Sequence, residues 1–285
     1  MTRREAITLP ILLARPARAA SLDEEARRTM LRAARFLRSI ATEGGYLWWY
    51  SADLKQRAGE SAATETQIWV QPPGTPSVGE AYLRAWKVTG EEFFLECAQA
   101  AARALLRGQL ESGGWDYLIE FDPALRSRWN YRLDPAPRGR NVSTYDDDNT
   151  QSALRFLLNL VTARDDAEIR LAAQYALESA WNAQHPNGAF SQRFPAPVNS
   201  YYHWYTFNDN LMANWVRTMI QAWEQLQDPR AFYCAHGVGD FMLLAQLPEP
   251  HPVWAQQYDY AMQPTWARRF EPPAACSSES VNVIR

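Results

Sequence analysis

One repeated pattern covers most of this sequence: an apolar helical face, a tight break, a second apolar helical face, a glutamine, and a loop with an aromatic segment. The glutamines are Gln109, Gln184 and Gln246, at intervals of 75 and 62 residues. Repeated helix hairpins pack side by side into curved arrays, with the tight turns at one end and the long connections at the other. We therefore predict an all-α domain, an α/α toroid of helix hairpins with short aromatic strands in the long loops.

The long connections are where function is expected. They run from Gln109 to Asn149, from Gln184 to Asn208, and from Gln246 into the C-terminal tail. In the predicted array all of them share one end, and loops held by a rigid helical scaffold are the usual place for binding and catalytic residues.

Two of these connections end in oxygen-rich residues at the start of a helix. Asp146, Asp147 and Asp148 precede one apolar helical face, and Asn208-Asp209-Asn210 precede the next, with 62 residues between Asp147 and Asp209. Helix capping and the helix dipole explain one Asp at such a place. Adjacent carboxylates repel one another, and a bound cation is the simplest relief. If the two helix starts meet, they can form a cation site.

Composition excludes several other classes of protein. The net charge of −3 gives no general attraction to nucleic acid or to a membrane surface, and no segment after the N-terminus is long and apolar enough to span a bilayer. The three cysteines are widely spaced and form no metal motif or disulfide framework. The 12 Trp, 13 Tyr and 11 Phe residues suit either sugar rings or a packed core.

The N-terminal residues 1–20 have the features of an export signal: a basic start, a short apolar run from Ile7 to Ala14, and small residues at 17–19. We therefore expect a secreted or periplasmic protein with one folded domain at 21–285. Its first helix begins with a capping box formed by Ser21 and Glu24.

Several short motifs, in the same order, resemble the catalytic module of family 10 pectate lyases. They are Gly-Gly-Tyr-Leu-Trp at 44–48, Val-Gln-Pro-Pro-Gly-Thr-Pro at 70–76, Gly-Gly-Trp-Asp-Tyr at 113–117, Thr-Phe-Asn-Asp-Asn at 206–210, Trp-Ala-Gln-Gln-Tyr-Asp at 254–259, and Trp-Ala-Arg-Arg-Phe-Glu-Pro-Pro at 266–273. The resemblance implies an α/α toroid that cleaves polygalacturonate, an anionic polysaccharide, by β-elimination with calcium.

The resemblance also implies roles for particular residues. Arg268 stands where the family has its Brønsted base, although Arg269 beside it leaves the register open by one residue. From the residues alone, Arg268 would be a carboxylate clamp, because a free guanidinium keeps its proton at neutral pH. Asp147, Asp148 and Asp209 offer the oxygen ligands that calcium prefers.

The expected substrate-binding residues lie in the same long connections. They are Arg269, Trp204, Tyr205 and Trp254. Related modules continue beyond residues 278–280 into a further helix hairpin that closes the toroid, whereas this sequence stops at Arg285. We therefore expect either a fragment or a shortened homologue with an open groove. We also expect a monomer.

Three other functions fit parts of the sequence. An inverting glycoside hydrolase needs two carboxylates around a water, which Asp147 and Asp209 could supply without calcium. A uronate-binding protein without catalytic activity fits the short C-terminus. Gln109, Gly113 and Trp115 also match the spacing of a motif in squalene and hopene cyclases, although a glutamine and an aromatic residue at a helix end can simply staple the loop to the helix.

Overall fold

The computed structural model describes residues 21–285, so the predicted export signal at 1–20 lies outside the described residues. The helices are α1 (Leu22–Ser39), α2 (Thr75–Thr89), α3 (Glu92–Arg107), α4 (Asn149–Ala163), α5 (Ala167–Ala183), α6 (Leu211–Leu226), α7 (Pro229–Leu244) and α8 (Ser277–Ile284). The strands are β1 (Trp49–Tyr50), β2 (Arg57–Ala58), β3 (Gln67–Trp69), β4 (Leu118–Glu120), β5 (Ser143–Thr144), β6 (Arg193–Phe194), β7 (Tyr205–Thr206) and β8 (Gln257–Tyr258). A search of the described helices finds none with the length and apolar character that a membrane span needs.

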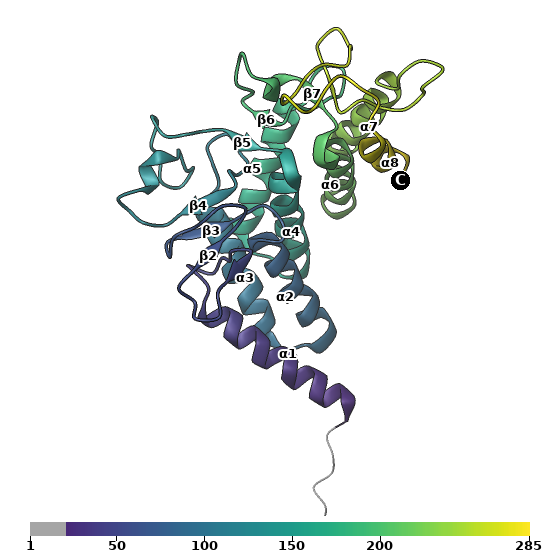
Figure 1. Cartoon of the computed structure of the whole chain (residues 1–285). Helices are drawn as coiled ribbons and strands as arrows, with labels where there is room; N and C mark the ends of the chain where they lie inside the picture. The colour runs from purple at the N-terminus through teal and green to yellow at the C-terminus, as the bar shows by residue number, and fades with distance from the viewer. Residues whose placement is uncertain (1–20) are drawn as a thin grey trace, which may run out of the picture.

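The chain forms three successive strand–helix–helix–strand units. They are β3-α2-α3-β4, β5-α4-α5-β6 and β7-α6-α7-β8. In each unit the strand before the first helix pairs antiparallel with the strand after the second helix. Because the strand pair closes the open end of its own helix hairpin, the long connections of all three units lie on the same side of the molecule, as Figure 1 shows.

The units stack through their helices. The first helices of the units contact one another in series, α2 with α4 and α4 with α6, and the second helices do the same, α3 with α5 and α5 with α7. Two layers of helices with this order are the arrangement of an α/α toroid, so the predicted fold is confirmed. In Figure 1 the hairpins follow one another as an open array.

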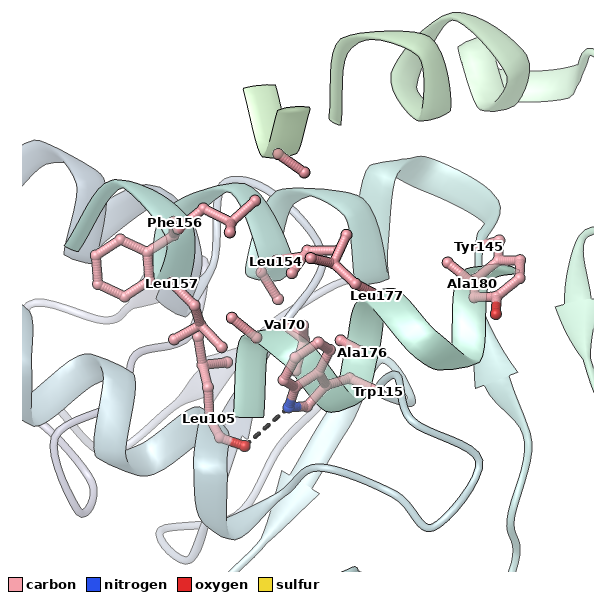
Figure 2. Packing of buried hydrophobic residues seen from close by; sticks show 14 of the residues in the cluster. Val70, Leu105, Trp115, Tyr145, Leu154, Phe156, Leu157, Ala176, Leu177 and Ala180 are labelled. Atoms are coloured by element: carbon pink, nitrogen blue, oxygen red, sulfur yellow. Dashed lines mark hydrogen bonds between the residues drawn. The ribbon is translucent and has the colours of Figure 1, made fainter. Parts of the chain in front are cut away.

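The core of the array surrounds α4, which packs against α2, α5 and α6. Leu154 and Leu157 of α4 are fully buried and lie near Leu177 of α5 (Figure 2). Trp115 enters this core from the connection after α3 and donates from Nε1 to the carbonyl oxygen of Leu105 at 2.8 Å. Burial of each such side chain contributes about 1.5–3 kcal/mol, so the core fixes the helix that directly follows the Asp run.

The first two of the repeated glutamines each fasten their own unit to the next one. Gln109 Nε2 donates to the carbonyl oxygens of Gly113 and of Ala172 in α5, both at 2.9 Å. Gln184 Nε2 donates in the same way to Gly188 at 3.0 Å and to Cys234 in α7 at 2.9 Å. These bonds confirm the staple interpretation of the glutamine repeat, and they account for its spacing without any cyclase chemistry.

Candidate metal centre and substrate-binding loops

Two short 3₁₀ turns place the acidic residues. Turn η2 (Asp146–Asp148) directly precedes α4, and η4 (Asn208–Asn210) directly precedes α6. Each turn ends in two successive residues with left-handed backbone, Asp147 (φ 53°) with Asp148 (φ 59°), and Asp209 (φ 50°) with Asn210 (φ 63°). Because the second and third units repeat the same geometry, η2 and η4 contact each other.

The left-handed backbone gives a local reason for part of this sequence. Asp and Asn tolerate this conformation better than other residues with a side chain. The capping explanation is wrong, since the side chain at the N-cap position of α4, Asp148, and that of α6, Asn210, make no capping hydrogen bond. Neither helix capping nor left-handed backbone explains the carboxylate of Asp146, because the backbone of Asp146 is not left-handed.

The carboxylates of Asp146, Asp147 and Asp209 meet where the two turns touch. One oxygen atom from each lies within 4.8 Å of the others. Asp146 and Asp147 are half-buried, and Asp209 is exposed, so the group opens to solvent on one side. The group contains two of the predicted ligands, Asp147 and Asp209, with Asp146 in the position expected for Asp148.

Asp148 points to a different partner. It forms an ion pair with Arg155, which also donates from Nη1 to Thr218 Oγ1 at 2.8 Å. The second oxygen of Asp148, Oδ1, is buried and has no hydrogen-bond partner among the described residues. Burial raises the pKa of Asp148, and Arg155 acts in the opposite direction. Its role as a ligand therefore stays a prediction that rests on this single free oxygen.

Neutral donors orient the acidic group. Tyr117, in the connection before β4, donates its hydroxyl to Asp147 Oδ2 at 2.8 Å. Asn208 Nδ2 donates to Asp209 Oδ2 at 2.5 Å and, more weakly, to Asp146 Oδ1 at 3.4 Å. The group thus draws on all three units: Tyr117 from the first, Asp146 and Asp147 from the second, and Asp209 from the third.

The proximity of the carboxylates changes their acidity. Burial raises the pKa of Asp146 to about 8, and the charges of Asp147 and Asp209 add to the effect. Partial desolvation and the charge of Asp147 also raise the pKa of Asp209. Three carboxylates with few positive partners are costly to ionise together. A hard divalent cation favours such oxygen ligands and would remove this cost, so the residues present fit calcium.

Arg268 lies within electrostatic reach of the acidic group, where its charge lowers the pKa of both Asp146 and Asp209 against the larger effect of desolvation. Its guanidinium forms a two-point ion pair with Glu271, Nε to Oε2 at 2.7 Å and Nη2 to Oε1 at 2.6 Å. This pair raises the pKa of Arg268 further above its ordinary value. Arg269 is exposed and makes no ion pair with the described residues.

The three aromatic residues expected to bind substrate have different environments. Trp204 is half-buried, with its ring 3.9 Å from His203 and 4.9 Å from Tyr260. Tyr205 and Trp254 are each only 8% exposed and pack in the core. Trp254 Nε1 donates to the carbonyl oxygen of Met242 at 2.7 Å. Of these three residues, Trp204 alone is exposed enough to offer a ring surface to a ligand.

Three residues of the site were absent from the sequence prediction. Asp146 belongs to the acidic run, but the run alone does not tell which of its members turn inward. Tyr117 ends the Gly-Gly-Trp-Asp-Tyr motif, and Asn208 stands in the Thr-Phe-Asn-Asp-Asn motif. Both motifs belong to the family resemblance, and their polar side chains are the sequence signal for hydrogen-bond partners of the acidic group.

Comparison with solved structures gives the class of the fold. Two structures of the family 10 polysaccharide lyase from Cellvibrio cellulosa, one of them a mutant in complex with trigalacturonic acid, match with a TM-score of 0.55 and 22% identity, over 73% of this chain and 64% of theirs. Cellobiose 2-epimerase from Bacillus thermoamylovorans matches with a TM-score of 0.56 and 9% identity, over 93% of this chain and 66% of the epimerase. At these identities the likeness establishes a shared α/α toroid fold.

The sequence itself gives the family. The profile of the pectic acid lyase family matches residues 109–285, which is more than half of the chain. The chain therefore belongs to the pectic acid lyase family. The matched residues include η2, η4 and Arg268. A search of curated proteins found no match to the sequence.

Proposed function

We propose that this protein is a polysaccharide lyase that cleaves polygalacturonate by calcium-assisted β-elimination. The observation that carries the proposal is the group of Asp146, Asp147 and Asp209, whose oxygens lie within 4.8 Å of one another on the loop side of a pectic acid lyase family chain. The trigalacturonic acid bound by the Cellvibrio cellulosa lyase supports an anionic polysaccharide as the substrate.

The elimination needs the proton on C5 of a uronate to become acidic. Calcium held by Asp146, Asp147 and Asp209 would supply positive charge that withdraws electron density from the substrate carboxylate. When the C5 proton is removed, the electron pair of the C5–H bond forms the C4=C5 double bond. The C4–O bond to the leaving sugar breaks, and the leaving oxygen takes a proton.

Arg268 is the proposed base. In the structure Glu271 holds it by two hydrogen bonds and keeps it protonated. The base role therefore requires this ion pair to open and the guanidinium to lose its proton when substrate binds. The side chain of Arg268 is 49% exposed, so it is free to turn away from Glu271.

The distance between the carboxylates argues against an inverting glycoside hydrolase. Such an enzyme needs its two carboxyl groups about 6.5–9.5 Å apart to admit a water between them. Asp147 and Asp209 present oxygens within 4.8 Å of each other. A uronate-binding protein without catalytic activity makes no such demand and is separated from the lyase by experiment.

The decisive experiment follows ultraviolet absorbance during incubation with polygalacturonate, first with calcium and then with excess chelator. We expect a rise that the chelator abolishes, because the unsaturated product absorbs. Asp209→Asn is the matched variant, and it should lower calcium-dependent turnover at least ~100-fold by removal of one ligand charge. New reducing ends without absorbance would indicate hydrolysis, and binding without either signal would indicate a non-catalytic protein.

Two further predictions complete the proposal. The first is that the protein is secreted or periplasmic, because residues 1–20 have the features of an export signal. Export would bring the enzyme to pectic polymers. All three carboxylates of the acidic group come from one chain, and we propose a monomer.

A further inference from the structure

Arg193 is a half-buried arginine beside the acidic group, and it has no acidic partner among the described residues. It lies on β6, directly across from Thr144 of β5, and Thr144 is two residues before Asp146. Its Nε atom is buried without a hydrogen-bond partner, and no carboxylate of the described residues lies within ion-pair distance of its guanidinium. A charged group without partners in a partly desolvated place is costly.

Three other arginines around this end of the molecule are already occupied by carboxylates, although the exposed Arg269 has no such partner in the described part of the chain. Arg155 pairs with Asp148, Arg268 with Glu271, and Arg140 with Asp116. Their charge is neutralised within the protein. The charge of Arg193 is therefore available to an external anion in a way that the charge of these three is not.

Two donors of Arg193, its Nη groups, have no partner among the described residues, whereas Nε is covered. Its guanidinium carbon lies 3.8 Å from the centre of the Tyr202 ring, in turn η3 (Tyr201–His203). Stacking of this kind uses the flat face of the guanidinium, whereas the N–H groups point outward from its edges. The edge that carries the two Nη groups matches the two oxygens of a carboxylate. Tyr202 thus holds the side chain in a position where it can form a two-point contact.

The position of Arg193 connects it to the acidic group through Tyr117. Tyr117 donates to Asp147. Burial and the charges of Asp146 and Asp147 raise the pKa of Tyr117, and the charge of Arg193 acts in the opposite direction. Arg193 is therefore close enough to affect the residue that orients a proposed cation ligand.

We propose that Arg193 binds a second carboxylate of the polygalacturonate chain, next to the uronate held at the acidic group, and so selects for unesterified sugars there. This inference rests on the proposed function. Every sugar of the polymer carries one carboxyl group, so a chain that places one carboxylate at the cation brings others alongside. A methyl ester removes the charge and one acceptor, and the two-point contact with Arg193 is then lost.

The test compares Arg193→Gln and Arg193→Lys with the intact enzyme. We expect Arg193→Gln to raise KM for polygalacturonate about ten-fold with kcat within about two-fold, because the lost contact is equally strong in ground and transition states. Arg193→Lys keeps the charge without the fork and should fall between the two. The preference for unesterified over partly methyl-esterified substrate should be strongest in the intact enzyme, weaker in Arg193→Lys and weakest in Arg193→Gln.

Arg230→Gln is the matched control, because Arg230 also stacks at 3.8 Å, on Trp181, but pairs with Asp228 away from the acidic group. If both Arg193 variants are folded and retain the KM and ester preference of the intact enzyme, the inference is wrong. Calorimetric titration with trigalacturonate separates it from the proposed function. If the protein catalyses no elimination, weaker trigalacturonate binding by Arg193→Gln than by the intact protein still supports the inference about Arg193. If the intact protein does not bind trigalacturonate at all, the inference about Arg193 is wrong.

Discussion

At the scale of single residues, the site depends on which way each Asp of one run turns. The left-handed backbone at Asp147 and Asp148 sends two neighbouring carboxylates to different partners, Asp147 to Tyr117 and Asp148 to Arg155. The sequence predicted Asp147 and Asp209 because they stand at equivalent places in a repeat. It could not predict Asp146, because helix periodicity carries no information about a turn whose residues are not helical.

Arg268 gives the first prediction at this scale. Arg268→Ala should lower kcat ~1,000-fold if Arg268 is the base, because general bases contribute about 10²–10⁴-fold. Trigalacturonate affinity should change little, because the base acts mainly in the transition state. Steady-state kinetics and calorimetry measure the two quantities. A raised KM with unchanged kcat would make Arg268 a carboxylate clamp, and a larger kcat loss in Arg269→Ala would move the base by one residue.

Asp146 gives a prediction about pH. The pKa of Asp146 is raised in the folded protein to about 8 from 3.8. Between these values the folded protein holds a proton that the unfolded chain has lost, so without metal the stability falls as pH rises from about 4 to about 8 and is constant above. Asp146→Asn removes this loss. Relative to the original protein, its free energy of unfolding should gain ~2 kcal/mol between pH 5 and pH 8, roughly half the ideal value because the site is partly solvated.

Urea unfolding in excess chelator at several pH values measures this difference. Asp165→Asn is a suitable control, because Asp165 is an exposed residue in the tight turn between α4 and α5, away from the acidic group. Parallel pH profiles for the original protein and Asp146→Asn would show that Asp146 ionises freely, and the like-charge argument for a cation would lose its electrostatic support.

At the scale of elements, the helix hairpins could be read from apolar periodicity, and the strands could not. Helices of 15 to 17 residues give several turns of signal, as in α4 and α5. Strands β5 to β8 have two residues each, too few for alternation to be visible. The aromatic segments pointed to strands in the loops, but their pairing within each unit follows from the closed hairpin and not from any local pattern.

The glutamine staples give a prediction at this scale. Gln109 is fully buried, donates to two carbonyl oxygens and accepts from Arg132 Nε, so Gln109→Ala removes these bonds and opens a cavity. We expect a loss of about 2–4 kcal/mol in the free energy of unfolding. Gln246→Ala removes a single exposed hydrogen bond, to Pro252, and should cost less than about 1 kcal/mol. Equal losses measured by urea unfolding would contradict the staple.

At the scale of the whole molecule, the acidic group lies across the boundary between two repeat units. Asp146 and Asp147 come from η2 in front of α4, and Asp209 comes from η4 in front of α6. The units already pack through α4 and α6, but their loop ends carry like charges that repel. A cation held by both turns would convert this repulsion into a link between the units.

Calcium should therefore raise the free energy of unfolding as well as the rate of the reaction. At a calcium concentration 100 times the dissociation constant, the gain is ~2.7 kcal/mol, or roughly 5 °C in Tm for a chain of this size. Magnesium should give less, because it demands a stricter geometry and keeps more of its water. Differential scanning calorimetry measures the shift, and Asp209→Asn should abolish most of it.

Hydrogen exchange tests whether the cation joins the two units or only one. If it is held by both turns, calcium should slow amide exchange together in residues 143–149 and 205–211, since neither turn can open without breaking the shared ligand set. Exchange at the tight turn between α6 and α7, at 226–229, lies at the opposite end of the hairpin and should not respond. Protection confined to 143–149 would place the cation on η2 alone. Asp209 would then not be a ligand of the cation, and the proposal of a cation site shared by η2 and η4 would be wrong.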